Sequence, residues 1–285
     1  MLIPFTKMHG CGNDYIYVNC FEGEPQNPGA VSAAMSPRHF SVGADGLVLI
    51  CRSDAADAKM RMFNLDGSEG KMCGNAIRCV GKYLYDNKMT DKTGLSIETL
   101  SGIKHLSLSV SAGCVESVTV DMGKATFAAA EIPVLADSET VVDAPLAIGD
   151  KTYRITCVSM GNPHAVTFVP DPDGLALEKT GPLFEHHPMF PERVNTEFIQ
   201  VIDSRHLKMR VWERGSGETW ACGTGACAAV AAAVKNGYCK AGEPVTVHLL
   251  GGDLVIEVDK DFRVKMTGGA AKVYEGVYEY EDQNQ

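Results

Sequence analysis

Several features that define other classes of protein are missing from this sequence of 285 residues. It has no run of about 18 apolar residues, so no transmembrane helix is expected. The first ten residues lack the basic segment followed by an apolar segment that marks a secretory signal peptide. The net charge of −10 argues against nucleic acid or an anionic membrane as the main partner. We therefore expect a cytoplasmic protein that binds neither nucleic acid nor a membrane.

Signatures of metal and cofactor sites are missing as well. The ten cysteines are scattered, with no Cys-x-x-Cys pair and no cysteine–histidine cluster at zinc spacing. The pair His186-His187 has no third ligand in view. The glycine-rich segments lack the lysine of a phosphate-binding loop and the strand–GxGxxG–helix layout of a dinucleotide site. We expect neither a metal nor a cofactor, and we expect free thiols in a reducing compartment.

Two short segments share a pattern that indicates reactive thiols. Met72-Cys73-Gly74-Asn75 and Ala221-Cys222-Gly223-Thr224 each place a cysteine and a glycine directly before a run with helical character. A cysteine at a helix N-terminus lies beside unpaired backbone N–H groups and the helix dipole, which stabilise a thiolate. A lone cysteine is more often a small buried apolar residue than a nucleophile. Because two occur in matching contexts, we interpret Cys73 and Cys222 as a functional pair.

The two segments belong to a longer internal repeat. At an offset of 149 residues, five groups of positions coincide without a gap, which predicts two halves of the same design. The matched positions are Gly12-Asn13 with Gly161-Asn162, Gly46 with Asn195, Asn64 with Glu213, Cys73-Gly74 with Cys222-Gly223, and Leu100-Ser101-Gly102 with Leu249-Leu250-Gly251.

Short segments rich in alternating or β-branched residues predict strands, and apolar periodicity predicts a few helices. The run after Gly225 is apolar on every side up to Asn236, so this helix should be buried all round, with Gly237 as its C-cap. In the first half, strands are expected at residues 4–8, 15–20, 47–51, 59–64, 95–99, 105–110 and 115–120, and helices at 30–40 and from Cys73 to about Asn87.

These elements predict an α/β protein of the α+β type. We expect two pseudo-symmetric domains, each a curved, mainly antiparallel sheet or barrel around one central helix. The predicted domains are residues 1–125 with 269–285, and residues 126–268. The tail after Gly268 lies beyond the second repeat and could cross back to the first half.

Two opposed thiols suit the inversion of a carbon stereocentre through a carbanion. One thiolate removes the proton from one face and the other thiol delivers a proton to the opposite face. Charge moves into the substrate carboxylate during this step, and backbone N–H groups at two helix N-termini are suitable donors for it. Gly74-Asn75 and Gly223-Thr224 are placed to supply these groups.

The polar residues around the repeat have plain structural interpretations too. Asn64 lies in a segment typical of a turn. On most protein surfaces, adjacent charged residues such as Glu213-Arg214 are solvated and have no functional role. Their matched place, nine residues before each cysteine, favours a pocket role in which Glu213 accepts an ammonium and Arg214 binds a second carboxylate. For His164, a structural and a pocket role are weighed equally.

The motifs resemble those of the diaminopimelate epimerase family over nearly the whole chain. They are 7–14 (KMHGCGND), 43–46 (GADG), 63–69 (FNLDGSE), 72–75 (MCGN), 160–164 (MGNPH), 193–195 (RVN), 213–219 (ERGSGET) and 221–225 (ACGTG). The resemblance implies cofactor-independent interconversion of LL- and meso-diaminopimelate, a precursor of lysine and peptidoglycan. It also implies two similar domains that close on the substrate, and a homodimer.

The same resemblance implies roles for individual residues. Cys73 and Cys222 would be the acid/base thiols, and His164 and Glu213 would tune their pKa values. The reacting α-carboxylate would be held by Gly74, Asn75, Gly223 and Thr224, and the reacting amine would lie near Asn64 and Glu213. The distal end of the substrate would be held by Asn13, Asn162, Asn195 and Arg214.

Two positions depart from the family pattern. Gly46 stands where some relatives have glutamine, and Cys11 stands where leucine is more usual, adding a third thiol near the pocket. Two alternatives to a diaminopimelate epimerase remain open. One is a racemase of another amino acid with the same thiol pair. The other is a thiol redox sensor in which the two cysteines form a disulfide.

Overall fold

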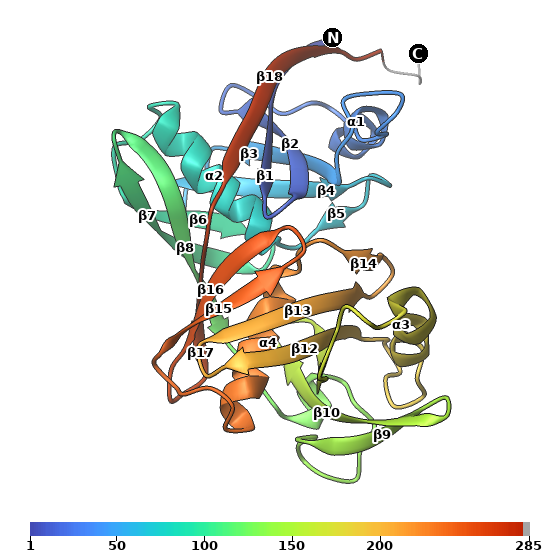
Figure 1. Ribbon diagram of the computed structural model, residues 1–285. Coiled ribbons are helices and arrows are strands. Elements are labelled where there is room, and N and C mark those ends of the chain that lie inside the picture. The colour runs from blue at the N-terminus through green and yellow to red at the C-terminus, as the bar shows by residue number, and fades with distance from the viewer. Residues whose placement is uncertain (282–285) are drawn as a thin grey trace. The chain divides into compact units, whose positions relative to one another are not determined.

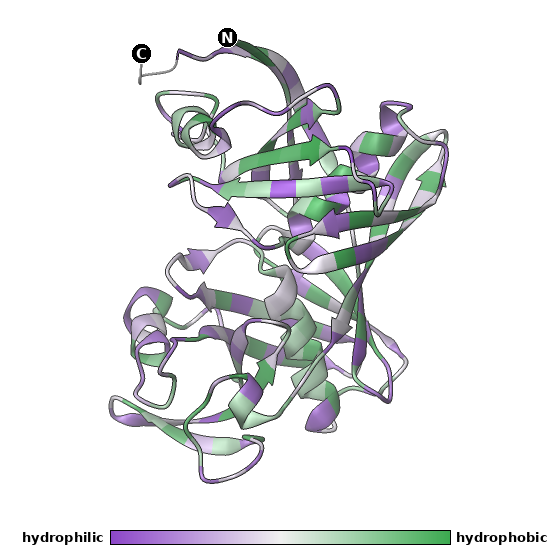
Figure 2. Cartoon of the chain, turned by 180° about the vertical axis from the view of Figure 1, so that it is seen from behind, coloured by the Kyte–Doolittle hydropathy of each residue, from purple (hydrophilic) through white to green (hydrophobic). Residues whose placement is uncertain are grey.

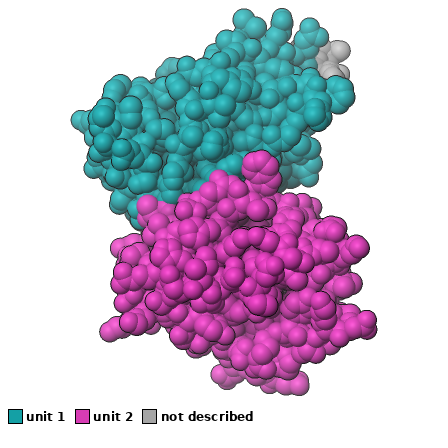
Figure 3. Space-filling view, in the orientation of Figure 1, with its two compact units in different colours: residues 1–120, 268–285 teal, residues 121–267 magenta. Residues whose placement is uncertain are grey.

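The computed structural model describes residues 1–281, which divide into two compact units (Figure 3). Residues 1–120 with the segment from 268 onward form the first unit, and residues 121–267 form the second. Within the described residues, no helix is long and apolar enough to span a membrane. The predicted domain bounds lie within a few residues of the bounds of these units. They stay a prediction, because a compact unit is not by itself evidence of a duplicated domain.

The first unit contains most of its strands in antiparallel hairpins (Figure 1). The exceptions are β2 with β3 and β4 with β6, which pair in parallel. The final strand β18 pairs antiparallel with β1. The elements are β1 (Leu2–Gly10), β2 (Asn13–Cys20), α1 (Pro28–Met35), β3 (Gly46–Cys51), β4 (Ala58–Asn64), β5 (Glu69–Gly70), α2 (Gly74–Asp86), β6 (Gly94–Thr99), β7 (Gly102–Ser111), β8 (Cys114–Lys124) and β18 (Ala271–Glu279).

The second unit repeats this scheme, with β11 parallel to β12 and β13 parallel to β15. Mixed helices and mainly antiparallel strands confirm the predicted α+β class. The elements are the 3₁₀ helix η1 (Ala129–Glu131), β9 (Ala144–Ile148), β10 (Lys151–Ser159), β11 (Pro163–Phe168), α3 (Leu177–Glu185), β12 (Asn195–Asp203), β13 (His206–Glu213), β14 (Gly217–Thr219), α4 (Gly223–Lys235), β15 (Pro244–Leu249), β16 (Gly252–Val258) and β17 (Arg263–Gly268).

The strand registers of the two units match at the predicted offset. Tyr15 pairs with Gly46 across β2 and β3. His164 pairs with Asn195 across β11 and β12, and both residues stand at the repeat offset from the first pair. The hairpins that carry β5 and β14 match in the same way. Register decides which face each side chain occupies, so equal registers place matched residues equivalently within their own units.

The ungapped match does not extend to the last predicted pair. Thr99 pairs with Gly102 at the β6–β7 turn, and Leu249 pairs with Gly252 at the β15–β16 turn. Leu249 therefore corresponds to Thr99, and the predicted match of Leu100 to Leu249 is wrong by one residue. One additional residue between α4 and β15 accounts for the shift.

In each unit the helix that follows the matched cysteine packs against several strands. α2 packs against β1, β2 and β7, and α4 packs against β10, β11, β12, β15 and β16. As predicted, α4 is buried on all sides, with Gly223 and the run from Gly225 to Ala233 all buried. In Figure 2 its ribbon is pale to green along most of its length. Small side chains allow this close approach, because alanine fills little space between helix and sheet.

Two helices differ from the prediction. The helix expected at residues 30–40 is α1, which ends at Met35, because Pro37 has no N–H with which to continue the helical hydrogen bonds. The helix α3 was not predicted, since Pro182 lies inside it.

A close contact between α3 and β13 gives a stability prediction. A Cβ atom at Gly181 would lie 2.2 Å from Cδ2 of the Trp212 ring. We expect Gly181→Ala to lower the free energy of unfolding by about 1–3 kcal/mol, although alanine favours a helix, because overpacking displaces the ring. Urea denaturation measures this change. The control Gly94→Ala, where a Cβ meets nothing within 4 Å, should be near neutral, and equal effects of the two would contradict the prediction.

Candidate active site

Cys73 is the N-cap residue of α2, in the first unit. Its backbone is extended, with φ −134° and ψ 122°, and its Sγ donates a hydrogen bond to Oδ1 of Asn13 at 3.3 Å. Asn75, in the first turn of the helix, donates from Nδ2 to the same oxygen at 3.2 Å. The predicted residues Cys73, Asn13 and Asn75 therefore lie together.

The turn between β1 and β2 positions Asn13. Its two residues, Cys11 and Gly12, have φ of 53° and 76°, the left-handed values of a tight two-residue hairpin turn. This fixes Asn13 as the first residue of β2, facing the start of α2. Nδ2 of Asn13 donates to Oδ2 of Asp45 at 2.7 Å, so the amide is held from both ends.

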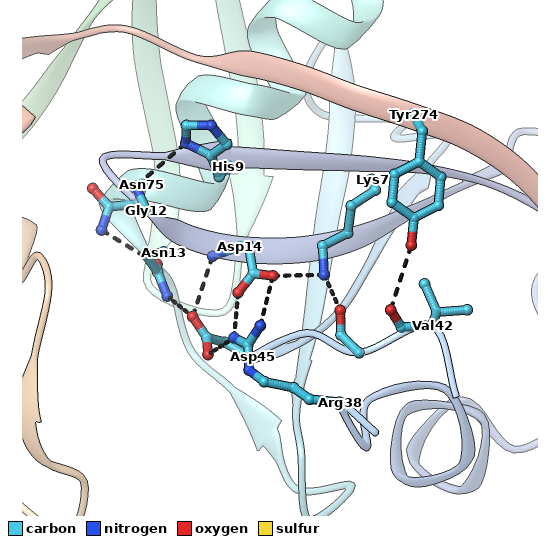
Figure 4. A network of polar contacts seen from close by, with 11 residues as sticks. Lys7, His9, Gly12, Asn13, Asp14, Arg38, Val42, Asp45, Asn75 and Tyr274 are labelled. Carbon is cyan, nitrogen blue, oxygen red and sulfur yellow. Dashed lines mark hydrogen bonds and ion pairs between the residues drawn. The ribbon is translucent and has the colours of Figure 1, made fainter. Parts of the chain in front are cut away.

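A network of ion pairs lies behind Asn13 (Figure 4). Arg38 contacts Asp14 at 2.5 Å and Asp45 at 2.8 Å, and Lys7 contacts Asp14 at 2.6 Å and donates to the carbonyl of Gly43. Burial alone would raise the pKa of Asp14, but Arg38 and Lys7 hold it below its ordinary value. Asp14 is therefore ionised at neutral pH, and the network is a rigid charged support for the turn.

Asn64 does not contact this cluster. It ends β4, and its exposed side chain donates from Nδ2 to Oγ of Ser68 at 2.9 Å, within the turn. Gly46, paired with Asn64 across β3 and β4, has no room for a side chain, since its Cβ would lie 2.1 Å from the carbonyl oxygen of Phe63. A glutamine at this position would require a different backbone.

Cys222 is the N-cap residue of α4, in the second unit, with φ −111° and ψ 108°. The N–H of Gly225 donates to its Sγ at 3.3 Å, and Oγ1 of Thr224 lies 3.5 Å from the same sulfur. Both contacts come from the first turn of the helix, where backbone N–H groups have no helical partner. The predicted pair Cys222 and Thr224 is thus brought together.

His164 is fully buried on β11 and connects to this thiol through hydrogen bonds. Its Nδ1 lies 2.7 Å from Oε1 of Glu197, which is also fully buried, and its Nε2 lies 3.0 Å from Oδ1 of Asn162. Asn162 donates from Nδ2 to Oγ1 of Thr224 at 3.3 Å. Three side chains, those of His164, Asn162 and Thr224, therefore link Glu197 to the Cys222 sulfur.

The Cys222 thiol has a raised pKa, contrary to the effect expected from a helix N-terminus alone. Burial is the main cause, and the negative charges of Glu213 and Glu197 add to it. Hydrogen bonds from Thr224 and the Gly225 N–H act in the opposite direction, as the sequence suggested, but are outweighed. The free thiol is therefore the favoured form of Cys222 in the absence of substrate.

Glu213 is the last residue of β13 and Arg214 begins the turn that follows, and the side chains of Asn195 and Glu185 hold this turn. Asn195 is buried and accepts a hydrogen bond from the Arg214 backbone N–H at 2.9 Å, while donating to the carbonyl of Pro163 at 2.8 Å. Glu185, from α3, accepts from the Gly215 N–H at 2.9 Å. The guanidinium of Arg214 donates to the Glu192 carbonyl at 2.9 Å. Both ends of the Asn195 amide are bonded to the backbone, so this side chain supports the turn.

Sequence reasoning assigned no role to Glu197, Glu185 or Asp45. Asp45 lies in the segment GADG at residues 43–46, whose resemblance to the family is the one feature of the sequence that points to it. Glu197 is a single acid in a buried strand, and Glu185 ends a helix that was not predicted. Among the described residues, no group of three histidine, cysteine, aspartate or glutamate side chains is arranged to hold a metal ion.

Solved structures with this fold come from several enzyme classes. A hydroxyproline epimerase from Agrobacterium vitis matches with a TM-score of 0.72 at 17% identity, over 99% of this chain and 94% of that chain. A PhzF-family phenazine biosynthesis protein from Bacillus anthracis matches with a TM-score of 0.72 at 18% identity, over 98% and 100%. The chain therefore has the two-domain fold shared by these epimerases and PhzF proteins.

Sequence comparison narrows this class to one family. The family model of diaminopimelate epimerase matches residues 5–128 and 156–273. A diaminopimelate epimerase of Acetivibrio thermocellus is 58% identical over 273 residues, covering 95% of this chain and 97% of that protein. One of Methanococcus maripaludis strain C5 is 57% identical over 275 residues, covering 96% and 99%. The chain belongs to the diaminopimelate epimerase family and is an isomerase, which confirms the resemblance.

The Glu213 carboxyl gives a prediction for stability against pH. Burial raises its pKa, against the lowering effects of Thr219 and Cys222. The folded state thus binds a proton that the unfolded state has released, so stability should fall as pH rises above the unfolded pKa of about 4.3. We expect Glu213→Gln to remove this fall, as measured by urea denaturation from pH 4 to 8.

The control is Glu139→Gln, an exposed carboxyl in the same unit. It should keep the wild-type dependence. A Glu213→Gln protein whose stability varies with pH as the wild type does would contradict the prediction.

Proposed function

We propose that this protein interconverts LL- and meso-2,6-diaminopimelate with two thiols and no cofactor, in the cytoplasm, supplying lysine and peptidoglycan synthesis. The observation that carries the proposal is the matched placement of Cys73 and Cys222 in a register-matched repeat. Each is the N-cap of a helix packed against the sheet of its unit. Curated relatives at 58%, 57% and 54% identity carry the name of this activity.

The proposed reaction conserves protons over one turnover. The thiolate of one cysteine takes the Cα proton, which breaks the C–H bond and forms an S–H bond. The other thiol then gives its own proton to the opposite face of the carbanion. The two sulfurs end with their roles exchanged, and the reverse reaction starts from that state.

Stabilisation of the carbanion is the second requirement. Negative charge develops on the α-carboxylate, and preorganised N–H donors stabilise it more than water does. The first turns of α2 and α4 offer such donors at Gly74-Asn75 and Gly223-Thr224. The Gly225 N–H, which donates to Cys222, serves the thiol rather than the substrate.

The other predicted residues take supporting roles in this proposal. His164 and Glu213 tune the Cys222 thiol, and Glu213 with Asn64 would receive the reacting amine. The distal end of the substrate would be held by Asn13, Asn162, Asn195 and Arg214. For Asn195, we infer that it acts by fixing the Arg214 backbone, because its amide is bonded to the protein from both ends.

Deuterium exchange tests the proposal. Reduced protein in heavy water should incorporate deuterium at Cα of LL-diaminopimelate without an added cofactor. Loss of a positioned acid or base typically costs about 10²–10⁴-fold, so Cys73→Ala and Cys222→Ala should each reduce epimerisation by that factor. The double variant should show no exchange, because no base remains.

The control is Cys114→Ser, an exposed thiol that should leave the rate unchanged. Undiminished exchange in the double variant would overturn the proposal. Activity on a monocarboxylic amino acid but not on diaminopimelate would favour a racemase instead. A reduced protein that turns over no amino acid would favour the redox sensor.

A homodimer is part of the proposal. Leu2 on β1 and Val273 and Val277 on β18 are apolar side chains that are more than half exposed, on two paired strands. Such a patch is typical of an interface. Sedimentation velocity should give the mass of two chains, and Val277→Lys should shift it toward one. A wild-type monomer would exclude the dimer.

A further inference from the structure

The two matched asparagines are turned in opposite directions. Asn13 and Asn162 are equivalent positions of the repeat, and each lies beside the N-cap thiol or the first turn of its unit's helix. Asn13 presents its Oδ1 to Cys73. Asn162 presents its Nδ2 to Thr224, which in turn contacts Cys222.

In the first unit, Asp45 fixes the orientation of the Asn13 side-chain amide. An ionised carboxylate can only accept hydrogen bonds, so the group that Asn13 turns toward Asp45 must be its NH₂. The Asp14 backbone N–H donates to the same oxygen at 3.2 Å, and Arg38 forms an ion pair with the other oxygen of Asp45 at 2.8 Å. The carbonyl oxygen of Asn13 is then left to face Cys73, where it accepts the S–H proton.

In the second unit, the pair of His164 and Glu197 fixes the orientation of the Asn162 side-chain amide. Nδ1 of His164 lies 2.7 Å from Oε1 of Glu197, and both side chains are fully buried. An ionised Glu197 can only accept a hydrogen bond, so Nδ1 then carries a proton. If Nε2 also carries a proton, it donates to Oδ1 of Asn162, and the Asn162 NH₂ must then point to Thr224.

The orientation of the Asn162 amide determines which groups donate hydrogen bonds to the Cys222 sulfur. Because Oγ1 of Thr224 accepts from Asn162, its own proton is available for Cys222, 3.5 Å away. The Gly225 N–H is a second donor to that sulfur. Cys222 is therefore approached by two donors, whereas the Cys73 sulfur acts as the donor in its contact with Asn13.

We propose that the charge behind each matched asparagine, Asp45 in one unit and a doubly protonated His164 paired with Glu197 in the other, makes Cys73 a hydrogen-bond donor and Cys222 an acceptor. Asp45 and Glu197 are thus positioning residues that make the two thiols chemically unequal. The inference rests on the proposed function only for the catalytic meaning of this difference. The protonation states themselves can be measured without turnover.

Other charges face both thiols and act alongside the asparagines. Tyr15 adjoins Cys73, and burial is the main cause that raises the pKa of its hydroxyl well above its ordinary value, so it stays neutral. Glu213 and Glu197 face Cys222 and disfavour its thiolate, as described above. A charge-matched control is therefore needed to separate the orientation of an asparagine from the loss of a negative charge.

The first measurement is the ¹⁵N NMR spectrum of histidine-labelled full-length protein at pH 7.5. His164 should show both ring nitrogens protonated, and Glu197→Gln should convert it to a singly protonated ring. A neutral His164 ring in the wild type would overturn the second half of the inference. Circular dichroism melting would confirm that the variant is folded, and a milder variant, Glu197→Asp, should keep the doubly protonated ring.

The second measurement is the pH dependence of Cys73 alkylation by iodoacetamide, followed by peptide mass spectrometry. Asp45→Asn removes the constraint on the Asn13 amide, so the pH midpoint of Cys73 alkylation should fall by about one unit. At a fixed pH below the midpoint, this corresponds to about tenfold more thiolate. Asp14→Asn removes a nearby charge that does not contact the Asn13 amide, and should shift the midpoint less than half as far. Equal shifts in the two variants, or no shift, would overturn the first half.

Discussion

The structure depends on one constraint, the placement of a cysteine at the N-cap of a helix that packs against the sheet of its unit. The N-cap residue leaves the helical conformation while the first turn still presents unpaired N–H groups. At Cys222 one of these groups, the Gly225 N–H, is directed at the sulfur. The burial that supplies this geometry also raises the pKa of the thiol. A reactive thiolate at this place therefore needs groups that act against burial.

The two units surround their thiols with different residues on the same frame. The frame is common because β2–β3 and β11–β12 have the same parallel register. On it, a charged network of Lys7, Asp14, Arg38 and Asp45 supports the first thiol, and a buried His164–Glu197 pair supports the second. A duplicated scaffold with unlike supports suits a substrate whose carbon must be approached by a base on one face and an acid on the other.

The helix starts at the two cysteines and the buried helix of the second unit could be predicted from the sequence, because local features of the chain determine them. Cys73-Gly74 and Cys222-Gly223 predicted helix starts because local capping chemistry is read from neighbours in the chain. The apolar run after Gly225 predicted a buried helix because periodicity reports burial. His164 was among the predicted residues, but Glu197 was not, because it meets His164 only through the pairing of β11 with β12. The one-residue shift at Leu249 was missed because glycines and leucines align at more than one offset.

The central claim is that two groups act on opposite faces of one carbon, and isotope transfer tests it most directly. Reduced protein would convert LL-diaminopimelate carrying deuterium at Cα in ordinary water, with product and remaining substrate examined at early conversion. The account predicts that the inverted centre carries solvent hydrogen in essentially every product molecule, because the second thiol supplies it, while the remaining substrate keeps its deuterium. Deuterium retained at the inverted centre would show that a single base returns the proton it removed, and would contradict the account.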